Sequence, residues 1–482
     1  MLEELSPKEV FYYFEELSKI PRGSGNTKAA ADYCLQFAKQ HGLKARRDDA
    51  GNVVIFKKGS RGREEKEPVM LQGHLDMVCE KKPDCGIDME KEGVRLCTDG
   101  ETLWAEGTTL GADDGIAVAY ILAILASDTI EHPPIQAVLT SDEEVGMLGA
   151  RGLNTEGLTA KYLINLDSET EGIINVSCAG GVRAQCQIPI GFEETKREDY
   201  KAFTLKISHL LGGHSGIEIH KGRTNAIRLL ASLLAEAGKM SDLRLTELFG
   251  GGKYNVIPKE AEAKVLVKAS DIAAFQKNIE KSANLWLQDI QDAEPKAKIQ
   301  LEESLEIQKK ALDKSSTEKV LFALQMTLDG VYKMSRDISG MVETSLNLGT
   351  AALTEDALTY EYLIRSNTAA AQELLLSKVQ NFISYLSGEL KLQDSYPAWE
   401  YRKESKLREI CVGSFRKLYG KEAVVTAIHA GLECGILSGK MPGLDMVSFG
   451  PTLEGVHTPD ERMNISSARR TWEYLLEILK EL

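Results

Sequence analysis

The sequence lacks the features of several common protein classes. No apolar run reaches the ~18 residues of a membrane-spanning helix, and the opening stretch MLEELSPKEVFYYFEELSKI is acidic where a signal peptide would be basic and then apolar. We therefore expect a soluble, cytoplasmic protein with no membrane partner. The eight cysteines include no CxxC pair, so free thiols are favoured over a disulfide framework or a Cys-ligated zinc site.

Positive charge is also scarce. The chain has 58 Lys and Arg residues against 72 Asp and Glu residues, which gives a formal net charge of −14. A broad surface for nucleic acids or anionic lipids needs an excess of Lys and Arg, so we expect neither as a partner. The balance is better suited to binding metal cations.

Strand and helix patterns alternate in the first part of the chain. With 482 residues and 43% apolar content, two or three domains can each form a core. Helices are predicted from Ser6-Pro7, as N-cap and first helical residue, and over the stretch NTKAAADYCLQFAKQHG. Apolar segments then predict strands at 52–56, 68–72, 135–140 and 161–166, and a helix at 115–127. This order predicts an α/β fold with a doubly wound, mostly parallel sheet.

A different pattern begins at about residue 187. Amphipathic helices and alternating strands replace the α/β pattern, which resumes at about residue 398. We predict a first domain made of residues 1–186 and 398–482, with an inserted α+β domain at 187–397. Within the insert the order helix, strand, strand, helix occurs twice, with Asn255 and Asn347 at comparable places. This repeat is consistent with an internal duplication.

Potential metal ligands stand at the ends of the predicted strands. Side chains just beyond the carboxyl ends of parallel strands converge on one crevice. The residues at such places, together with a histidine near the C-terminus, are His74, Asp76, Asp113, Asp114, Glu143, Glu144, Asp167 and His457. Crowded carboxylates repel one another unless cations compensate them. A mixed set of imidazoles and carboxylates suits zinc or manganese, and a bridging Asp would allow a two-metal hydrolytic centre.

Each of these motifs has a simpler reading when it is taken alone. A lone HxD is mostly a capped loop, two aspartates before a helix are usually an N-cap, and two glutamates at a strand end are usually solvated. Their joint occurrence at successive strand ends favours the metal centre.

Several longer motifs resemble a known family. The stretches GHLDMV, GTTLGADDGIAVA, TSDEEVG, LINLDSETEG, GGHSGIEIHKGRTNAI, YNVIP and GVHTPDERMNI are similar, in order, to the dinuclear zinc peptidases and deacylases that include carnosinase and carboxypeptidase G. Within that family, IPRGSGN, IHAGLECGIL and the large insert most resemble bacterial dipeptidases that cleave Xaa-His dipeptides. The similarity covers nearly the whole chain, and it implies a catalytic domain with an inserted lid domain.

The resemblance implies roles for the motif residues. His74, Asp113 and Asp167 would hold one zinc ion, and Glu144, His457 and the bridging Asp113 the other; manganese or cobalt could substitute. Asp76 would orient the His74 ring. Glu143 would be the general base. Asp114 would support the turn, with a cis peptide bond before it.

The inserted domain would add further residues. His214 would polarise the scissile carbonyl, whereas His220 is read as a structural neighbour. Asn255 and Arg365 would hold the substrate and its C-terminal carboxylate, although an Arg at a strand end is often simply solvated. His429 and Glu433, four residues apart in a predicted helix, form either a surface pair or a pocket wall that contacts the substrate's amino end.

These expectations define a function and its alternatives. We expect a cytosolic dipeptidase with two zinc ions, acting on Xaa-His and other dipeptides by means of a hydroxide that bridges the ions. A homodimer is compatible with the resemblance. One alternative is an N-acyl amino acid deacylase or carboxypeptidase of the same family. The other is a non-catalytic, metal-dependent peptide-binding protein.

Overall fold

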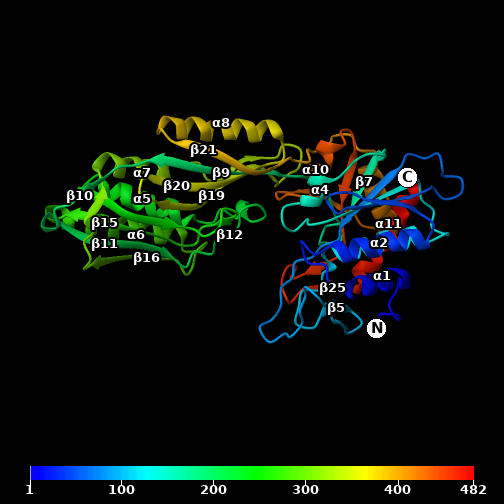
Figure 1. Ribbon diagram of the computed structural model, residues 1–482. Coiled ribbons are helices and arrows are strands. Elements are labelled where there is room, and N and C mark those ends of the chain that lie inside the picture. The colour runs from blue at the N-terminus through cyan, green and yellow to red at the C-terminus, as the bar shows by residue number, and fades with distance from the viewer. Residues whose placement is uncertain (1) are drawn as a thin grey trace. The chain divides into compact units, whose positions relative to one another are not determined.

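The chain divides into two compact units. The computed structural model describes residues 2–482. Unit 1 comprises residues 1–178, 399–428 and 432–482, and unit 2 comprises residues 179–398 and 429–431. Both ends of the chain belong to unit 1 (Figure 1).

Unit 1 is built on an eight-stranded mixed sheet. The strand order is β1-β2-β6-β3-β7-β23-β8-β22. The neighbours β6, β3, β7 and β23 run parallel, as do β8 and β22, whereas β1, β2 and the β23–β8 contact are antiparallel. The strands are β1 (Lys44–Arg47), β2 (Val53–Lys57), β3 (Val69–His74), β6 (Ile135–Thr140), β7 (Tyr162–Asn165), β8 (Ile173–Cys178), β22 (Val424–Ile428) and β23 (Asp445–Ser448). The predicted mostly parallel α/β sheet is confirmed.

Helices pack on this sheet and on one another. They are α1 (Lys8–Ser18), α2 (Lys28–Gln40), α3 (Ala112–Ala126), α4 (Leu148–Gly152), α9 (Lys406–Tyr419), α10 (Glu433–Lys440) and α11 (Ile465–Glu481). Helix α3 is apolar on every side, and it is buried between β3 and α1. Strands β3 and β6 are buried on both faces, so each is mainly apolar, although Gln72 and Gln136 interrupt the apolar residues. A small sheet of β4 (Leu96–Thr98), β5 (Thr102–Ala105), β24 (Leu453–Glu454) and β25 (Arg462–Asn464) completes the unit.

Unit 2 contains an antiparallel sheet with a repeated topology. Its main strands lie in the order β16-β11-β15-β13-β19-β20-β9-β21, and β18 (Gly330–Met334) also pairs with β19. The first four are β16 (Lys298–Ser304), β11 (Tyr200–Ser208), β15 (Ala261–Lys268) and β13 (Leu243–Gly250). The second four are β19 (Val342–Leu353), β20 (Ala357–Ser366), β9 (Gly180–Pro189) and β21 (Glu389–Tyr396).

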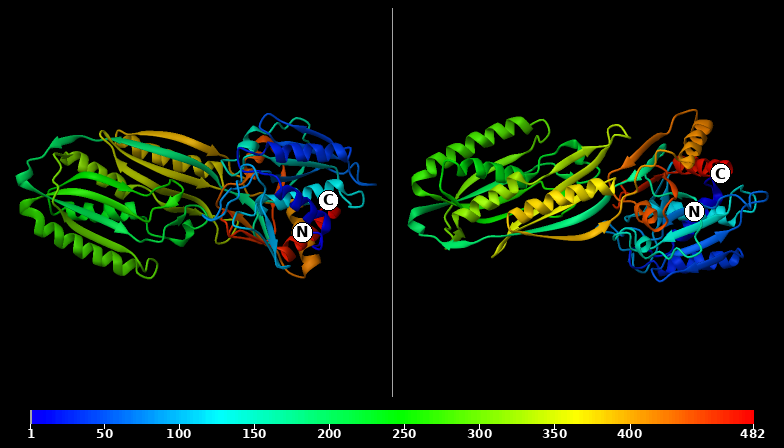
Figure 2. Two further views of the ribbon diagram at one scale, coloured as in Figure 1. Left: turned by 60° about the horizontal axis from the view of Figure 1, so that its bottom comes forward. Right: turned by 90° about the horizontal axis from the view of Figure 1, so that it is seen from above.

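Each half of unit 2 has the chain order strand, helix, strand, strand, helix, strand. In the first half this is β11, α5 (Ala226–Gly238), β13, β15, α6 (Ile272–Ile290) and β16. In the second half it is β9, α7 (Lys314–Met326), β19, β20, α8 (Ala369–Tyr385) and β21. The halves join where β13 pairs with β19, and α8 lies along β9, β20 and β21 (Figures 1 and 2). The predicted repeat is therefore present as topology, with the first half inserted between β9 and α7 of the second.

Some sequence expectations need correction. Pro7 rather than Ser6 is the N-cap of α1, because its ψ of 132° is extended and the helix begins at Lys8. Asn255 and Asn347 are not equivalent: Asn347 lies on β19, and its amide donates to the carbonyls of Tyr254 and Val256 on either side of Asn255. The first division of the chain falls after Cys178 rather than residue 186, because β9 already belongs to unit 2.

The structure also bears on the cysteines and on membrane-spanning helices. The eight cysteine thiols are free, and five of them are buried. No helix in the part of the chain that the structure describes, residues 2–482, has the length and apolar character needed to cross a membrane.

Candidate active site

The predicted ligands meet in unit 1, at the carboxyl ends of neighbouring strands. His74 is the last residue of β3, Glu143 and Glu144 follow β6, and Asp167 follows β7. Asp113 lies at the start of α3, and His457 lies in the loop between β24 and β25. The structure thus brings together side chains that are far apart in the sequence, at the edge of a parallel sheet where such sites usually form.

His74 is oriented through one ring nitrogen. Its Nδ1 lies 3.1 Å from the Asp76 carbonyl oxygen and 3.3 Å from Asp76 Oδ1. Both atoms are acceptors, so Nδ1 carries the proton and Nε2 presents its lone pair. Nε2 is 2.9 Å from Asp113 Oδ1 and 3.8 Å from Asp167 Oδ1. A lone pair that close to a carboxylate oxygen requires a cation or a proton between them.

Asp113 lies between the two imidazoles. Its Oδ1 faces His74, and its Oδ2 is 3.2 Å from His457 Nε2. The same His457 nitrogen is 2.8 Å from Glu144 Oε1. The peptide bond between Asp113 and Asp114 is cis, as expected. Asp114 Oδ2 accepts from the His74 backbone N–H at 3.1 Å, so Asp114 holds the end of β3.

Asp76 organises more of the site than the sequence predicted. Besides contacting His74, its carboxylate accepts from Ser24 Oγ at 2.8 Å and from the backbone N–H groups of Glu143 at 2.9 Å and Glu144 at 3.2 Å. The side chain is fully buried. Burial would raise the pKa of Asp76, but the hydrogen bonds outweigh it and lower the pKa to about 2.

The shifts in pKa show how strongly negative charge accumulates here. Burial opposes charging His74, yet its hydrogen bonds to Asp113 and Asp76 raise its pKa well above the usual value. Hydrogen bonds to Asp113 and Glu144 raise the pKa of His457 to about 10. Burial and the neighbouring aspartates raise the pKa of Asp167 well above its usual range. The site therefore favours added positive charge.

Glu143 stands apart from the ligand contacts. Burial raises the pKa of its carboxyl group to about 8, and the nearby carboxylates of Glu433 and Glu144 add to the shift, against the effect of His74. A pKa near neutrality suits a group that must accept a proton and return it.

The donor set fits a pair of divalent cations. Ligand atoms of His74, Asp113 and Glu144 lie within 4.8 Å of one another, as do those of His74, Asp114 and Asp167. Imidazole and carboxylate donors suit zinc and related ions. The second group contains Asp114 where the resemblance implies Asp113. The residues present therefore fit the metals that the resemblance implies.

Sequence reasoning missed two buried charged residues that hold the ligand loops. Arg22 Nη1 donates to the carbonyls of Leu75 and Asp76, each at 3.0 Å, and its Nη2 donates to Gly111. Gly111 has a φ of +71°, and a Cβ there would lie 2.6 Å from Arg22 Nη2, so only glycine fits.

The second missed residue is Glu461. Its Oε2 accepts from the N–H groups of residues 110 and 111 at 2.8 and 3.0 Å, and its Oε1 accepts from that of residue 112 at 2.8 Å. Glu461 therefore caps the loop that presents Asp113. Both residues lie within motifs quoted above, IPRGSGN and GVHTPDERMNI. A single charged residue in a loop, however, belongs to no regular spacing pattern that would identify it as functional.

Unit 2 brings three other predicted residues near one another. His214, on β12 (Gly213–His214), pairs with Val256 on β14 (Val256–Ile257), directly after Asn255. A Cβ on Gly216 would lie 3.0 Å from His214 Cε1 and 3.1 Å from Arg365 Nε, so His214 and Arg365 flank this glycine. Arg365 is 5% exposed and donates to Tyr396 Oη at 2.7 Å.

His214 has a defined tautomer. Its Nδ1 accepts from the backbone N–H groups of Gly216 and Ile217 at 3.1 and 3.0 Å, so the ring proton lies on Nε2. Burial lowers the pKa of His214, and the nearby Arg365 lowers it further. His214 is thus a neutral imidazole with Nε2–H as a donor.

The predicted helical pair of His429 and Glu433 does not form. Helix α10 begins at Glu433, and His429 lies in the loop before it and belongs to unit 2. There His429 Nε2 is 2.8 Å from Ser345 Oγ, and burial is the main reason that its pKa falls to about 3. Glu433 is fully buried in unit 1. Residues 429–432 form the loop between β22 and α10, so His429 and Glu433 do not share a helix.

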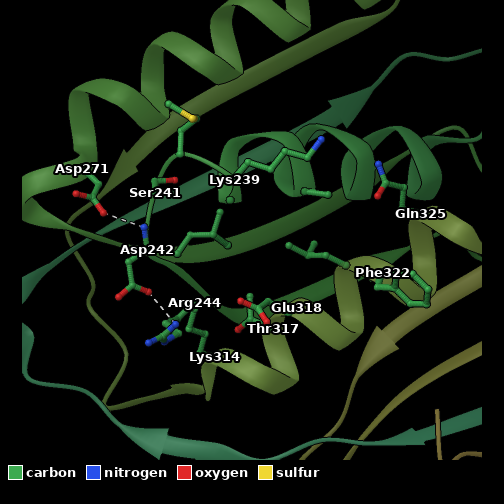
Figure 3. Close-up of a pocket in the computed structure, with 15 residues that line it drawn as sticks. Lys239, Ser241, Asp242, Arg244, Asp271, Lys314, Thr317, Glu318, Phe322 and Gln325 are labelled. Carbon is green, nitrogen blue, oxygen red and sulfur yellow. Dashed lines mark hydrogen bonds and ion pairs between the residues drawn. The ribbon is translucent and has the colours of Figure 1, made fainter. Parts of the chain in front are cut away.

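A separate pocket of about 550 Å³ lies within unit 2, between α7 and the turn that follows α5 (Figure 3). Two of its charged lining residues, Arg244 and Asp242, form an ion pair with each other. Arg244 Nη1 is 2.8 Å from Asp242 Oδ1, and Asp271 accepts from the Asp242 N–H at 2.8 Å. The residues that line it include no histidine and no cysteine, and none of the predicted site residues is among them.

The fold and the ligand cluster agree with comparisons to known proteins. Residues 70–481 match peptidase family M20/M25/M40, and the chain belongs to this family. It is 36% identical over 481 residues to the cytosol non-specific dipeptidase of Escherichia coli strain K12, covering 100% of this chain and 99% of that protein.

Solved structures give the same result. The aminoacylhistidine dipeptidase of Vibrio alginolyticus superposes with a TM-score of 0.93 at 34% identity, covering 100% of this chain and 98% of that chain. A tripeptidase from Staphylococcus aureus has a TM-score of 0.56 at 18% identity, covering 99% and 98%, and shares the fold alone. The family resemblance drawn from the motifs is confirmed.

Proposed function

We propose that the protein hydrolyses unblocked dipeptides, including dipeptides with C-terminal histidine such as β-alanyl-histidine, with two zinc ions as cofactors. The observation that carries this proposal is the ligand cluster of unit 1, in which Asp113 contacts both His74 and His457. The similarity to two full-length dipeptidases supports the substrate class. We also propose that the enzyme is cytoplasmic.

The contacts in unit 1 support an assignment of the metal ligands. His74, Asp113 and Asp167 would hold one ion, and Asp113, Glu144 and His457 the other. Such a pair supplies a water of lowered pKa and polarises a substrate carbonyl. Asp76 would keep the His74 ring oriented, because it fixes the proton on Nδ1.

The remaining residues would act on the substrate and on protons. Glu143 would accept the proton of the attacking water and return it to the leaving amine. His214 would donate its Nε2–H to the carbonyl oxygen as charge develops there. Arg365 would bind the C-terminal carboxylate, and Asn255 would contact the substrate next to His214. A substrate contact for Glu433 stays a prediction.

A hydrolysis screen with metal analysis tests the proposal. Unblocked dipeptides should be cleaved, whereas their N-acetylated forms and a ten-residue peptide should not. The protein should contain about two divalent ions per chain, and chelation should abolish activity until zinc, manganese or cobalt is restored. A fully active metal-free protein would overturn the mechanism.

Two outcomes of the screen would favour the alternatives. Preferential cleavage of N-acetylated substrates would indicate the deacylase or carboxypeptidase. Metal binding without turnover of any dipeptide would indicate a peptide-binding protein. The position of Glu143, half-buried beside the proposed ligands, favours the enzyme.

A further inference from the structure

Three buried polar side chains lie on neighbouring strands of unit 1, two to four residues before the proposed ligands. Gln72 lies two residues before His74 on β3, and Asn165 lies two residues before Asp167 at the end of β7. Thr140 ends β6, just before Glu143 and Glu144. All three are fully buried. Polar groups at such places must find partners inside the protein.

One carboxylate joins these side chains. Glu433 Oε2 accepts from Gln72 Nε2 at 2.5 Å and from Thr140 Oγ1 at 2.7 Å. Asn165 Nδ2 in turn donates to Gln72 Oε1 at 2.6 Å. Glu433 begins α10, in the part of unit 1 that follows the insert in the sequence. A residue from the second segment thus links three strands of the first.

The carboxylate also sets the direction of every hydrogen bond in this network. Oε2 can only accept, so Thr140 must direct its hydroxyl hydrogen to it and Gln72 must turn its NH₂ group to it. The carbonyl of Gln72 then faces the amide of Asn165. Without Glu433, the Gln72 amide and the Thr140 hydroxyl could take other orientations.

Stability alone does not account for this glutamate. Among residues 2–482 its Oε1 has no hydrogen-bond partner, although the side chain is 0% exposed. Leaving a buried carboxylate oxygen unpaired lowers the stability of the folded protein, because the desolvation of that oxygen is not compensated. In some proteins a buried group with such a cost is retained for the geometry that it imposes on a site.

We propose that Glu433 is a positioning residue of the metal centre: through Gln72, Thr140 and Asn165 it holds the carboxyl ends of β3, β6 and β7 at the spacing that the metal ligands need. This inference rests on the proposed function, because it concerns the same ligands. It differs from a substrate contact, since Glu433 acts here only through its neighbours.

Zinc titration of the metal-depleted protein against a chromophoric chelator tests this role. Glu433→Ala should weaken zinc binding by about 10–100-fold, the range usual for groups that orient metal ligands. Glu433→Gln keeps an oxygen that can accept from both Gln72 and Thr140, so it should restore most of the affinity. At saturating zinc, Glu433→Ala should lower kcat for a dipeptide and leave KM nearly unchanged.

Asp445→Ala is the matched control. Asp445 is also a buried carboxylate of unit 1 that accepts two hydrogen bonds, from Ser405 Oγ at 2.5 Å and from the Leu407 N–H at 3.0 Å, but neither donor is on β3, β6 or β7. Its replacement should lower stability without changing zinc affinity. Thr140→Val removes one donor and leaves Glu433 intact, so it should weaken zinc binding in the same direction and decides the test if Glu433→Ala does not fold.

The outcomes separate this inference from the proposed function. Wild-type protein that binds no zinc and cleaves no dipeptide would refute the proposed function. Zinc-binding, active wild type together with unchanged affinity in Glu433→Ala, or in Thr140→Val, would overturn this inference alone. A raised KM with unchanged zinc affinity would also overturn it, in favour of a substrate contact. Glu433→Gln as impaired as Glu433→Ala would refute positioning through hydrogen bonds.

Discussion

At the scale of residues, Glu143 and Glu144 are adjacent in one loop but have different surroundings. Glu144 Oε1 lies 2.8 Å from His457 Nε2, within the ligand cluster. Both residues donate their backbone N–H groups to Asp76, but the Glu143 carboxyl group is outside the ligand contacts, and burial raises its pKa to about 8. The geometry thus favours Glu144 as the ligand and Glu143 as the proton carrier.

Replacing Glu143 should remove catalysis and keep the metals. Glu143→Ala should lower kcat by at least about 10²-fold, the usual scale of general acid–base catalysis, while metal content stays near wild type. Glu144→Ala is the matched comparison and should lose metal. Loss of both ions from Glu143→Ala would mean that the two roles are exchanged.

His214 is prepared as a donor by its own loop. Two backbone N–H groups occupy Nδ1, so the Nε2–H is available to an oxygen atom. His214→Ala should lower kcat by about 10²–10³-fold, the loss typical of an oxyanion donor, with both metals retained. His220→Ala, a few residues away in a 3-10 turn, should change kcat little. Equal effects of the two substitutions would argue against this role.

At the scale of elements, hydrogen bonds among Asn225, Asp329 and Leu348 connect the two halves of unit 2, and we call this cluster the joint. Asn225 caps α5 by accepting from the N–H of Ile227, and it donates to the Leu348 carbonyl on β19. Asp329 accepts from the Leu348 N–H at 2.8 Å and from Asn225 Nδ2 at 3.2 Å. The joint therefore connects α5 of the first half to β19 of the second half.

The joint should make stability depend on pH. Burial raises the pKa of Asp329 to about 6, above its usual value of about 3.9. The neutral form is thus favoured in the folded protein, so this contribution to stability is complete below about pH 4 and is lost as pH rises through about 6. Asp329→Asn should be more stable than wild type at pH 8, by at most about 3 kcal/mol, and should differ less at pH 4.5.

Thermal unfolding of both proteins at the two pH values measures this difference. The Asp329→Asn change keeps an oxygen for both donors, so the comparison isolates ionisation. Asp337→Asn, at an exposed aspartate of the same unit, is the control and should show no pH-dependent gain. A difference between wild type and Asp329→Asn that does not vary with pH would contradict the expectation.

The elements of unit 1 were largely readable from the sequence, because apolar runs and strand-end ligands are local patterns. The predicted strand at 135–140 coincides with β6, and the ligands at the ends of β3 and β7 follow from the same rule. Arg22, Glu461 and Glu433 act through long-range contacts to backbone or buried amides, which no local pattern encodes. The prediction that His429 and Glu433 share a helix was wrong for another reason: a spacing of four residues does not show where a helix begins.

At the scale of the whole molecule, the two halves of unit 2 share the proposed substrate contacts. His214 and Asn255 belong to the first half of unit 2, whereas Arg365 lies on β20 of the second half. Gly216 nevertheless lies against both His214 and Arg365.

Mixing two inactive variants tests whether His214 acts in the active site of its own chain. His214→Ala lacks the proposed oxyanion donor, and Glu143→Ala lacks the proposed base, so each should be nearly inactive alone. If each chain uses its own His214, no activity should return when the two are mixed, even after partial unfolding and refolding together to allow exchange of subunits. A homodimer in which each site uses the partner's His214 would instead form mixed dimers, in which one of the two sites has both intact residues.

For an equal mixture with random pairing of chains, about a quarter of the wild-type activity would then return. Wild-type chains refolded in the same way control for losses during the procedure. Recovery of activity would show that the histidine crosses between subunits, and that duplication of the insert does not replace the partner.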